Sequence, residues 1–157
     1  MRQNGFSLLE LMIAAAVILG VTGFAISNYS SFNQTERLRQ SGKTFKEDLR
    51  LAQTRANAGI KPSTCVTPAT LVGYTVSFPS GSSYAIQGQC SVGGPSGPVT
   101  TTVLPNGITF AGNPASITFA VLTGAAGAAQ TITLSGVGHT YKIQVSASGD
   151  INDLGYQ

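Results

Sequence analysis

Catalytic chemistry needs histidines, carboxylates or thiols at defined spacings, and this chain offers few of them. His139 is the only histidine, so no second one can complete a metal set or a catalytic triad. The glycine-rich stretch 93–98 lacks the Gly-Lys-Ser/Thr sequence of a phosphate-binding loop, so we interpret it as an ordinary loop. No serine has the context of a nucleophile elbow. We predict that the protein is not an enzyme and holds neither a metal nor a cofactor.

Two carboxylates near the C-terminus, Asp150 and Asp153, are close enough in sequence to raise the question of a cation site. The chain before them lacks the density of oxygen ligands that a calcium loop requires. We therefore interpret both as turn residues.

Cys65 and Cys90 are the two cysteines of the chain. An even pair in an exported domain favours one disulfide, and two free buried thiols are the alternative. A disulfide here would stabilise the fold by about 3 kcal/mol in the chain-entropy model. It implies no redox role.

Glu10 is the most unusual carboxylate, because it lies inside an apolar run that extends from Phe6 to Ile26. The run is long enough to cross a bilayer as a helix, and Arg2 would keep the N-terminus cytoplasmic. A carboxylate at the centre of such a helix costs about 2.5–3.5 kcal/mol on the insertion scale, and less near an end. A neutral residue would avoid this cost, so we expect Glu10 to have a functional partner.

Three kinds of N-terminal segment compete to explain this run. A secretory signal would place a small-residue cleavage site after it, but the residues after Ile26 offer none. A plain signal anchor would explain the apolar residues but not Glu10. The segment from Gly5 to Leu11 instead resembles the class III signal of type IV prepilins and type II secretion pseudopilins. Its elements are a short basic leader, Gly, an aromatic residue, and Glu at the fifth place after the cut.

The resemblance implies that prepilin peptidase cuts after Gly5, that Phe6 becomes an N-methylated N-terminus, and that the apolar helix is retained. Glu10 of one subunit would then neutralise the Phe6 amine of a neighbour, and such a buried pair can set register. Many major pilins have a proline near residue 27. This chain has none there, and Gly20 and Gly23 are the flexible points of the run.

From Ser27 to Ala58 the chain is polar but has no strong helix breaker. Small and apolar residues recur there at steps of three and four, which predicts one buried helical face. That face consists of Leu38, Gly42, Phe45, Leu49, Ala52 and Ala56. Gly59, with Pro62 just beyond it, predicts the end of the helix.

A basic stripe lies beside this face and consists of Arg39, Lys43, Lys46 and Arg50. It is either a solvated helix face, supported by pairs such as Glu47 with Arg50, or a contact with DNA or another surface. We favour the solvated face, because no aromatic residue interleaves the stripe. The segment Asn152–Gln157 also contains no Lys or Arg, whereas DNA-binding FimT-type pilins have a basic C-terminal motif.

After Pro62 the apolar period changes to two, as in β-strands. Alternating or apolar segments separated by turn signals predict about seven short strands. They cover 72–78, a partner from Tyr84, 99–104, 108–110, 117–121, 131–134 and 141–145, with 79–82 as a turn and 124–129 as a hairpin tip. We therefore predict an α+β fold, in which a long N-terminal helix packs on an antiparallel β-sheet or β-sandwich head.

Four segments follow: a leader removed from 1–5, a transmembrane or filament-core helix at 6–27, an amphipathic helix half at 28–61, and a β-rich head at 62–157. Stretches 48–56 and 148–151 are similar to the GspH/FimT/FimU type of minor pilin. We expect a structural subunit of a type IV pilus-like filament, and a minor one. The alternatives are a type II secretion pseudopilin or a filament-borne binding module for DNA uptake or adhesion.

The resemblance also implies partners and a location. The expected partners are prepilin peptidase, other pilin subunits, the inner-membrane assembly platform and the membrane itself, while nucleic acid is not favoured. Before assembly the chain would be a single-pass protein of the inner membrane, with its head outside the cytoplasm. After assembly it would be part of a periplasmic or extracellular filament.

Overall fold

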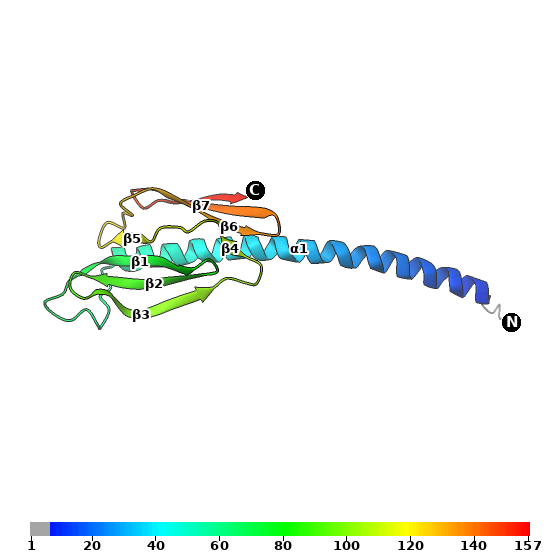
Figure 1. Cartoon of the computed structure of the whole chain (residues 1–157), viewed down its shortest axis with the longest axis horizontal. Coiled ribbons are helices and arrows are strands. Elements are labelled where there is room, and N and C mark those ends of the chain that lie inside the picture. The colour runs from blue at the N-terminus through cyan, green and yellow to red at the C-terminus, as the bar shows by residue number, and fades with distance from the viewer. Residues whose placement is uncertain (1–6) are drawn as a thin grey trace, which may run out of the picture. The chain divides into compact units, whose positions relative to one another are not determined.

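The computed structural model describes residues 7–157, apart from the side chains of residues 24–31. The chain divides into two units, Met1–Gln34 and Thr35–Gln157, and the second is the head. In the described part, helix α1 (Leu8–Asn57) is followed by eight strands (Figure 1). They are β1 (Leu71–Ser80), β2 (Ser83–Cys90), β3 (Gly94–Val103), β4 (Thr109–Phe110), β5 (Ile117–Ala120), β6 (Gln130–Gly136), β7 (His139–Val145) and β8 (Ile151–Tyr156).

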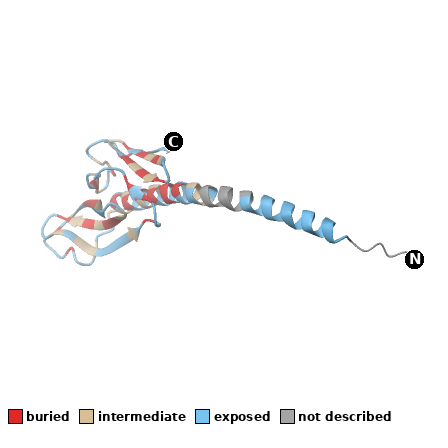
Figure 2. Ribbon diagram, turned by 45° about the vertical axis from the view of Figure 1, so that its right-hand side comes forward, coloured by how far each residue is buried: buried red, intermediate tan, exposed pale blue. Residues whose placement is uncertain are grey.

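The strands form two antiparallel sheets of four strands each. Their orders are β3-β2-β1-β5 in the first sheet and β4-β6-β7-β8 in the second. The two sheets lie on different sides of the part of α1 that belongs to the head (Figures 1 and 2). Because one helix packs on two antiparallel sheets, the predicted α+β class is confirmed.

The predicted face of α1 is the centre of the head core. Its members are all buried, and five of them have no exposed surface: Leu38, Phe45, Leu49, Ala52 and Ala56. The ring centroid of Phe45 lies 4.8 Å from that of Tyr84 in β2 and 5.3 Å from that of Phe110 in β4. One helical side chain therefore contacts both sheets, and the three elements share a single core.

Polar contacts fix the helix against the strands and loops. The Tyr84 hydroxyl donates a hydrogen bond to the Asp48 carboxylate, and burial together with this bond raises the pKa of Tyr84. Nearer the helix end, Gln53 Nε2 donates to the carbonyl of Gly149 at 2.8 Å and to that of Gly124 at 3.2 Å. A single side chain thus joins two loops that are far apart in sequence.

The helix ends where Gly59 predicts it. Gly59 has a φ of 61°, its N–H donates to the carbonyl of Ala56, and the N–H of Ile60 donates to that of Arg55. These two bonds and the left-handed residue form a Schellman motif, which satisfies carbonyls that the helix leaves open.

Three sequence-based interpretations of the head are wrong in detail. Residues 93–98 do not form only a loop, because β3 begins at Gly94 and includes Pro95 and Pro98. This strand lies at a sheet edge, where prolines are tolerated. The predicted turn at 79–82 is shorter, since β1 continues to Ser80. Residues 124–129 are not a hairpin tip, because β5 and β6 belong to different sheets.

Strand β8 was missed altogether. Its sequence, Ile-Asn-Asp-Leu-Gly-Tyr, lacks the alternation of apolar and polar residues that marks a half-buried strand. It pairs with β7 across a register shift between Lys142 and Ile143. Asp153 therefore lies in a strand and not in a turn.

Gly42 provides a test of how closely the helix approaches the second sheet. A Cβ atom at this position would lie 2.3 Å from a ring carbon of Tyr141 in β7. We expect Gly42→Ala to lower the free energy of unfolding by about 1–3 kcal/mol, because the ring must move. Urea unfolding of the full chain in detergent micelles, followed by circular dichroism, measures this change.

Gly20→Ala is the matched control, since a Cβ atom there meets no neighbour within 4 Å and alanine favours the helix. Equal stability of the two variants would contradict the close approach of α1 and β7.

Candidate functional site

The described part of the N-terminal unit begins with a capped helix. The N–H of Leu9 donates to Ser7 Oγ at 3.3 Å, and the N–H of Leu11 donates to the Ser7 carbonyl at 3.2 Å. Ser7 is therefore the N-cap, and Glu10 lies three residues later in the first helical turn. Serine followed by glutamate at this spacing is the sequence signature of a capping box, which sequence reasoning could have used to find Ser7.

The place of Glu10 in the first helical turn partly explains why a carboxylate is tolerated in the apolar run. The N-terminal turn of a helix carries partial positive charge, so a carboxylate there is stabilised by about 0.3–1 kcal/mol. Glu10 is exposed in the single chain. Gly5 and Phe6, the predicted processing residues, lie outside the described residues, so the structure places Glu10 but not its predicted partner.

The helix that follows Glu10 exposes apolar side chains in every direction. All residues from 7 to 23 are exposed, including Leu9, Ile13, Val17 and Val21. A helix that is apolar all round requires cover from lipid or from other helices. Figure 2 shows the contrast within α1, whose residues from Leu38 onward include a buried face.

Polar groups within this segment are satisfied locally. The Thr22 hydroxyl donates to the carbonyl of Ile18 in the same helix. Helix α1 continues through Gly20, Gly23 and the site where many major pilins have proline. Within the fully described residues, 7–23 and 32–157, no helical segment is long and apolar enough to cross a membrane.

The basic stripe is partly used within the molecule. Lys46 Nζ lies 3.2 Å from Asp153 Oδ2 in β8. Arg39 is 3.1 Å from Glu36, and its guanidinium carbon lies 4.6 Å from the ring centroid of Tyr156. The fold thus places an aromatic side chain, Tyr156, beside the basic stripe, which has none in its own sequence. The Arg39 guanidinium lies over the ring of Tyr156. The two other members, Lys43 and Arg50, are exposed.

Asp153 is the centre of a small polar cluster between α1 and the second sheet. Its Oδ2 atom accepts hydrogen bonds from Lys46 and from the Tyr141 hydroxyl, and its Oδ1 atom accepts one from the N–H of Gly155. Burial acts to raise the pKa of Asp153, but these bonds and the Lys46 charge outweigh it and lower that pKa. Burial and the carboxylate raise the pKa of Tyr141 to about 12.

The remaining candidate residues are the two cysteines, His139 and Asp150, and each of them contacts other residues of the head. Cys65 and Cys90 form a disulfide with a Cα–Cα distance of 5.9 Å, which joins the α1–β1 connection to the end of β2. His139 begins β7, is exposed, and lies 4.9 Å from Tyr156 between ring centroids. Asp150 accepts hydrogen bonds from Ser146 and Ser148. Within residues 7–157, no three His, Cys, Asp or Glu side chains gather in a metal-binding group.

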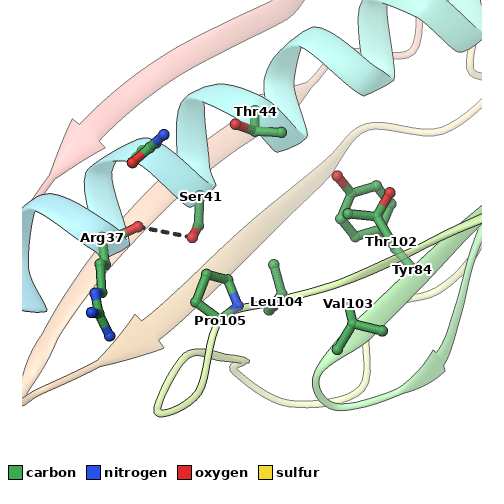
Figure 3. Close-up of a pocket in the computed structure, with 9 residues that line it drawn as sticks. Arg37, Ser41, Thr44, Tyr84, Thr102, Val103, Leu104 and Pro105 are labelled. Atoms are coloured by element: carbon green, nitrogen blue, oxygen red, sulfur yellow. Dashed lines mark hydrogen bonds between the residues drawn. The ribbon is translucent and has the colours of Figure 1, made fainter.

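A shallow pocket of about 260 Å³ opens between α1 and the end of β3 (Figure 3). Its lining combines the Tyr84 ring with Val103, Leu104 and Pro105, and Arg37 lies at one side. The Ser41 hydroxyl is already bonded to the Arg37 carbonyl at 2.8 Å. The pocket lacks a set of converging charged groups, so it does not identify a ligand.

Comparison with known proteins bears on the N-terminal segment. Residues 1–25 match the model of the prokaryotic N-terminal methylation motif. The chain is type IV pilin-like. No curated protein and no solved structure matches it. The motif is that of structural pilin and pseudopilin subunits, and it implies prepilin peptidase processing, a membrane-anchored precursor and assembly with other pilins.

The Asp153 cluster of this pilin-like chain predicts a pH dependence of stability. Because the folded pKa of Asp153 lies below its ordinary value of 3.8, the carboxylate contributes stability above that value. The contribution is lost as the pH falls through the folded pKa. We expect Asp153→Asn to lower the free energy of unfolding by about 0.5–1.5 kcal/mol near neutral pH, and the difference from wild type to shrink below pH 3.8.

Urea unfolding of the full chain in micelles at a series of pH values measures this difference. Asp150→Asn is the control, because its partners are two serine hydroxyls that an amide oxygen can also accept from. A gap between wild type and Asp153→Asn that is constant from neutral pH to pH 2 would contradict the assignment.

Proposed function

We propose that the chain is a structural subunit, and a minor one, of a type IV pilus-like filament, assembled through its N-terminal helix. The observation that carries the proposal is Glu10, which lies in the first turn of an exposed apolar helix inside the matched methylation motif. Prepilin peptidase would cut after Gly5 and leave Phe6 as the methylated N-terminus.

Glu10 would act as the register element of assembly. When the apolar helices of several subunits bundle, an unpaired carboxylate in their dry core is costly, whereas a carboxylate facing the Phe6 amine of a neighbour is neutralised. An axial slip of one subunit separates the two charges. Only one stagger between neighbours therefore satisfies both groups.

The proposed segments keep the sequence-based bounds. Residues 1–5 form the leader, 6–27 the membrane and filament-core helix, 28–61 the amphipathic half and 62–157 the head. Before assembly, 6–27 would hold the chain in the inner membrane as a single span, with the head outside the cytoplasm and the assembly platform as its next partner. A pseudopilin of a type II secretion system would use the same segments.

Binding of DNA by the head is the less favoured alternative. Arg39 and Lys46 already contact Glu36, Tyr156 and Asp153, so two of the four basic side chains in the stripe are engaged. We propose that the stripe serves chiefly to hold β8 against α1.

Processing has a direct readout in the mass of the mature protein. We expect the purified chain to lack residues 1–5 and to carry one added methyl group on Phe6. Intact-mass analysis of protein from cells with and without prepilin peptidase measures both changes. Mature protein that retains Met1 or Gln3 would exclude the proposed cut.

Assembly depends on Glu10 in a way that separates it from anchoring. We expect Glu10→Val to give a stable, processed, membrane-held protein whose yield in sheared filaments falls at least about tenfold, since a lost charge pair of about 1.4 kcal/mol corresponds to that factor. Immunoblots of the sheared and membrane fractions measure the yield.

Glu47→Ala is the matched control, because Glu47 is an exposed carboxylate of the same helix. Wild-type filament yield from Glu10→Val would refute the role given to Glu10.

A further inference from the structure

Arg55 is a partly buried cation for which the head supplies no carboxylate. It lies in the last turn of α1. The sequence contains no Asp or Glu between Asp48 and Asp150, so the whole first sheet is free of carboxylates. The ion pairs of the fully described residues, 7–23 and 32–157, do not include Arg55. A partly desolvated charge without a partner is costly, which favours an anion from outside the chain.

The two carboxylates that border this interval are used elsewhere. The Asp48 carboxylate accepts a hydrogen bond from a tyrosine hydroxyl of β2, and Asp150 accepts hydrogen bonds from serine hydroxyls of its own turn. The loop before Asp150 contacts the helix through Gln53, which donates to the carbonyl of Gly149. Residues two positions apart on a helix point in directions about 200° apart, so Arg55 faces away from this loop.

The position of Arg55 near the helix end offers a simpler role, which the structure makes unnecessary. A cation in the last turn interacts favourably with the helix dipole and can bond the open carbonyls. Those carbonyls already have backbone donors. The N–H groups of Gly59 and Leu122 both donate to the carbonyl of Ala56, and the N–H of Ile60 donates to that of Arg55 itself. The guanidinium is therefore available for another contact.

This guanidinium lines a pocket of about 450 Å³ between the end of α1, the α1–β1 connection and β3. Such a volume is within the range of about 300–1,000 Å³ that is usual for ligand sites. The lining combines the one cation with apolar and hydroxyl side chains. The apolar walls are Ile60, Pro62, Tyr74 and Pro98, and the hydroxyls are those of Ser63 and Ser96.

Two glycines of the first sheet set the shape of this pocket. A Cβ atom at Gly88 would lie 2.5 Å from Pro62 Cγ, and one at Gly97 would lie 2.7 Å from Pro62 Cβ. Any larger residue at either position would push Pro62 away from the sheet. Gly97 also has a φ of 95°, which other residues rarely adopt. The close approach of Pro62 to β2 and β3 therefore depends on both glycines.

Bonds from several elements hold the other walls. The Tyr74 hydroxyl donates to the carbonyl of Ile60 at 2.8 Å, and Ser96 Oγ donates to Thr64 Oγ1 at 2.8 Å. The disulfide ties the same connection to the end of β2. The pocket is thus formed before any ligand enters, so binding would cost little ordering of the protein.

We propose that this pocket binds a carboxylate of an extended peptide from a partner protein, together with the apolar side chain next to that carboxylate. A guanidinium presents paired N–H donors that match the two oxygens of a carboxylate, and the proline and tyrosine walls suit an apolar side chain. A phosphate group would carry a charge of about −1.5 to −2, which one guanidinium does not neutralise. The carboxylate belongs either to a chain terminus or to an acidic side chain.

The site lies wholly within Thr35–Gln157 and needs no second copy of the chain. It goes beyond the proposed function, because peptide binding by the head does not require filament assembly. Both can therefore be tested separately.

Titration of short peptides into the full chain, held in micelles of a non-ionic detergent, tests the site by calorimetry. The probes are acetyl-Ala-Pro-Leu with a free carboxylate, the same peptide with a C-terminal amide, and amidated acetyl-Ala-Pro-Glu. We expect saturable binding of at least one acidic probe, and at least about tenfold weaker binding of the amidated leucine peptide, since hydrogen bonds to a charged group are lost. The tighter of the two acidic probes identifies a terminal or a side-chain carboxylate as the source.

Arg55→Gln removes the charge and keeps a polar side chain of similar length. We expect it to weaken binding of the acidic probe at least about tenfold and to leave the amidated leucine peptide unchanged. Arg55→Lys retains the charge without the paired donors and should give an intermediate loss. Arg50→Gln is the matched control, because Arg50 is an exposed arginine of the same helix that does not line the pocket. Circular dichroism of each variant verifies that it is folded.

Three results would overturn the proposal. They are the absence of saturable binding by every probe, equal affinities for the free-acid and amidated leucine peptides, and wild-type affinity in Arg55→Gln. Displacement of the acidic probe by inorganic phosphate at lower concentrations than by acetate would indicate a general anion site and would also contradict it. All of these results leave the proposed filament function unaffected.

Discussion

The contact of Phe45 with both sheets is the interaction on which the rest of the head depends. The two sheets share no paired strands, so they are joined by the core and the connecting loops. Phe45 lies at the centre of that core, against Tyr84 of one sheet and Phe110 of the other. Such a ring buries a large apolar area, and the small residues around it let both sheets approach the helix. Gly42 has the same role on the side of Tyr141.

The helix satisfies two environments with one continuous backbone. Its first part presents apolar side chains all round, whereas its later part presents one narrow buried face and a polar remainder. Ser7 and Glu10 begin the helix with a cap and a favourable charge. The features that suit assembly and the features that start the helix therefore coincide in the same few residues.

How far sequence could predict this structure depends on where the information lies. The buried face from Leu38 to Ala56 was predictable, because apolar residues at helical spacing are visible in a short stretch of sequence, and these same residues pack in the core. The central strands were found for the same reason, since residues such as Tyr74 and Val76 alternate with polar ones. Strand β8 could not be predicted in this way. Its side chains contact Lys46 and Arg39, which are about a hundred residues away in sequence, and such contacts produce no periodic pattern in the strand itself.

The candidate site divides in a similar way. Glu10 could be singled out because a carboxylate in an apolar run is a local contradiction, and the matched motif supports that interpretation. Arg39 and Lys46 could not be assigned from sequence, since their partners come from the other end of the chain. The pocket beside Arg55 could not be predicted either, because its walls come from segments that are far apart in sequence.

The prolines of β3 bear on whether neighbouring heads could pair through their sheet edges. An open sheet edge invites a neighbouring strand to add to it, and heads held side by side at high density would fuse into continuous sheets. Pro95 and Pro98 have no N–H to offer along this edge, so an added strand would find gaps in its hydrogen bonds. Heads whose sheet edges cannot pair in this way therefore remain separate domains even when they are close together.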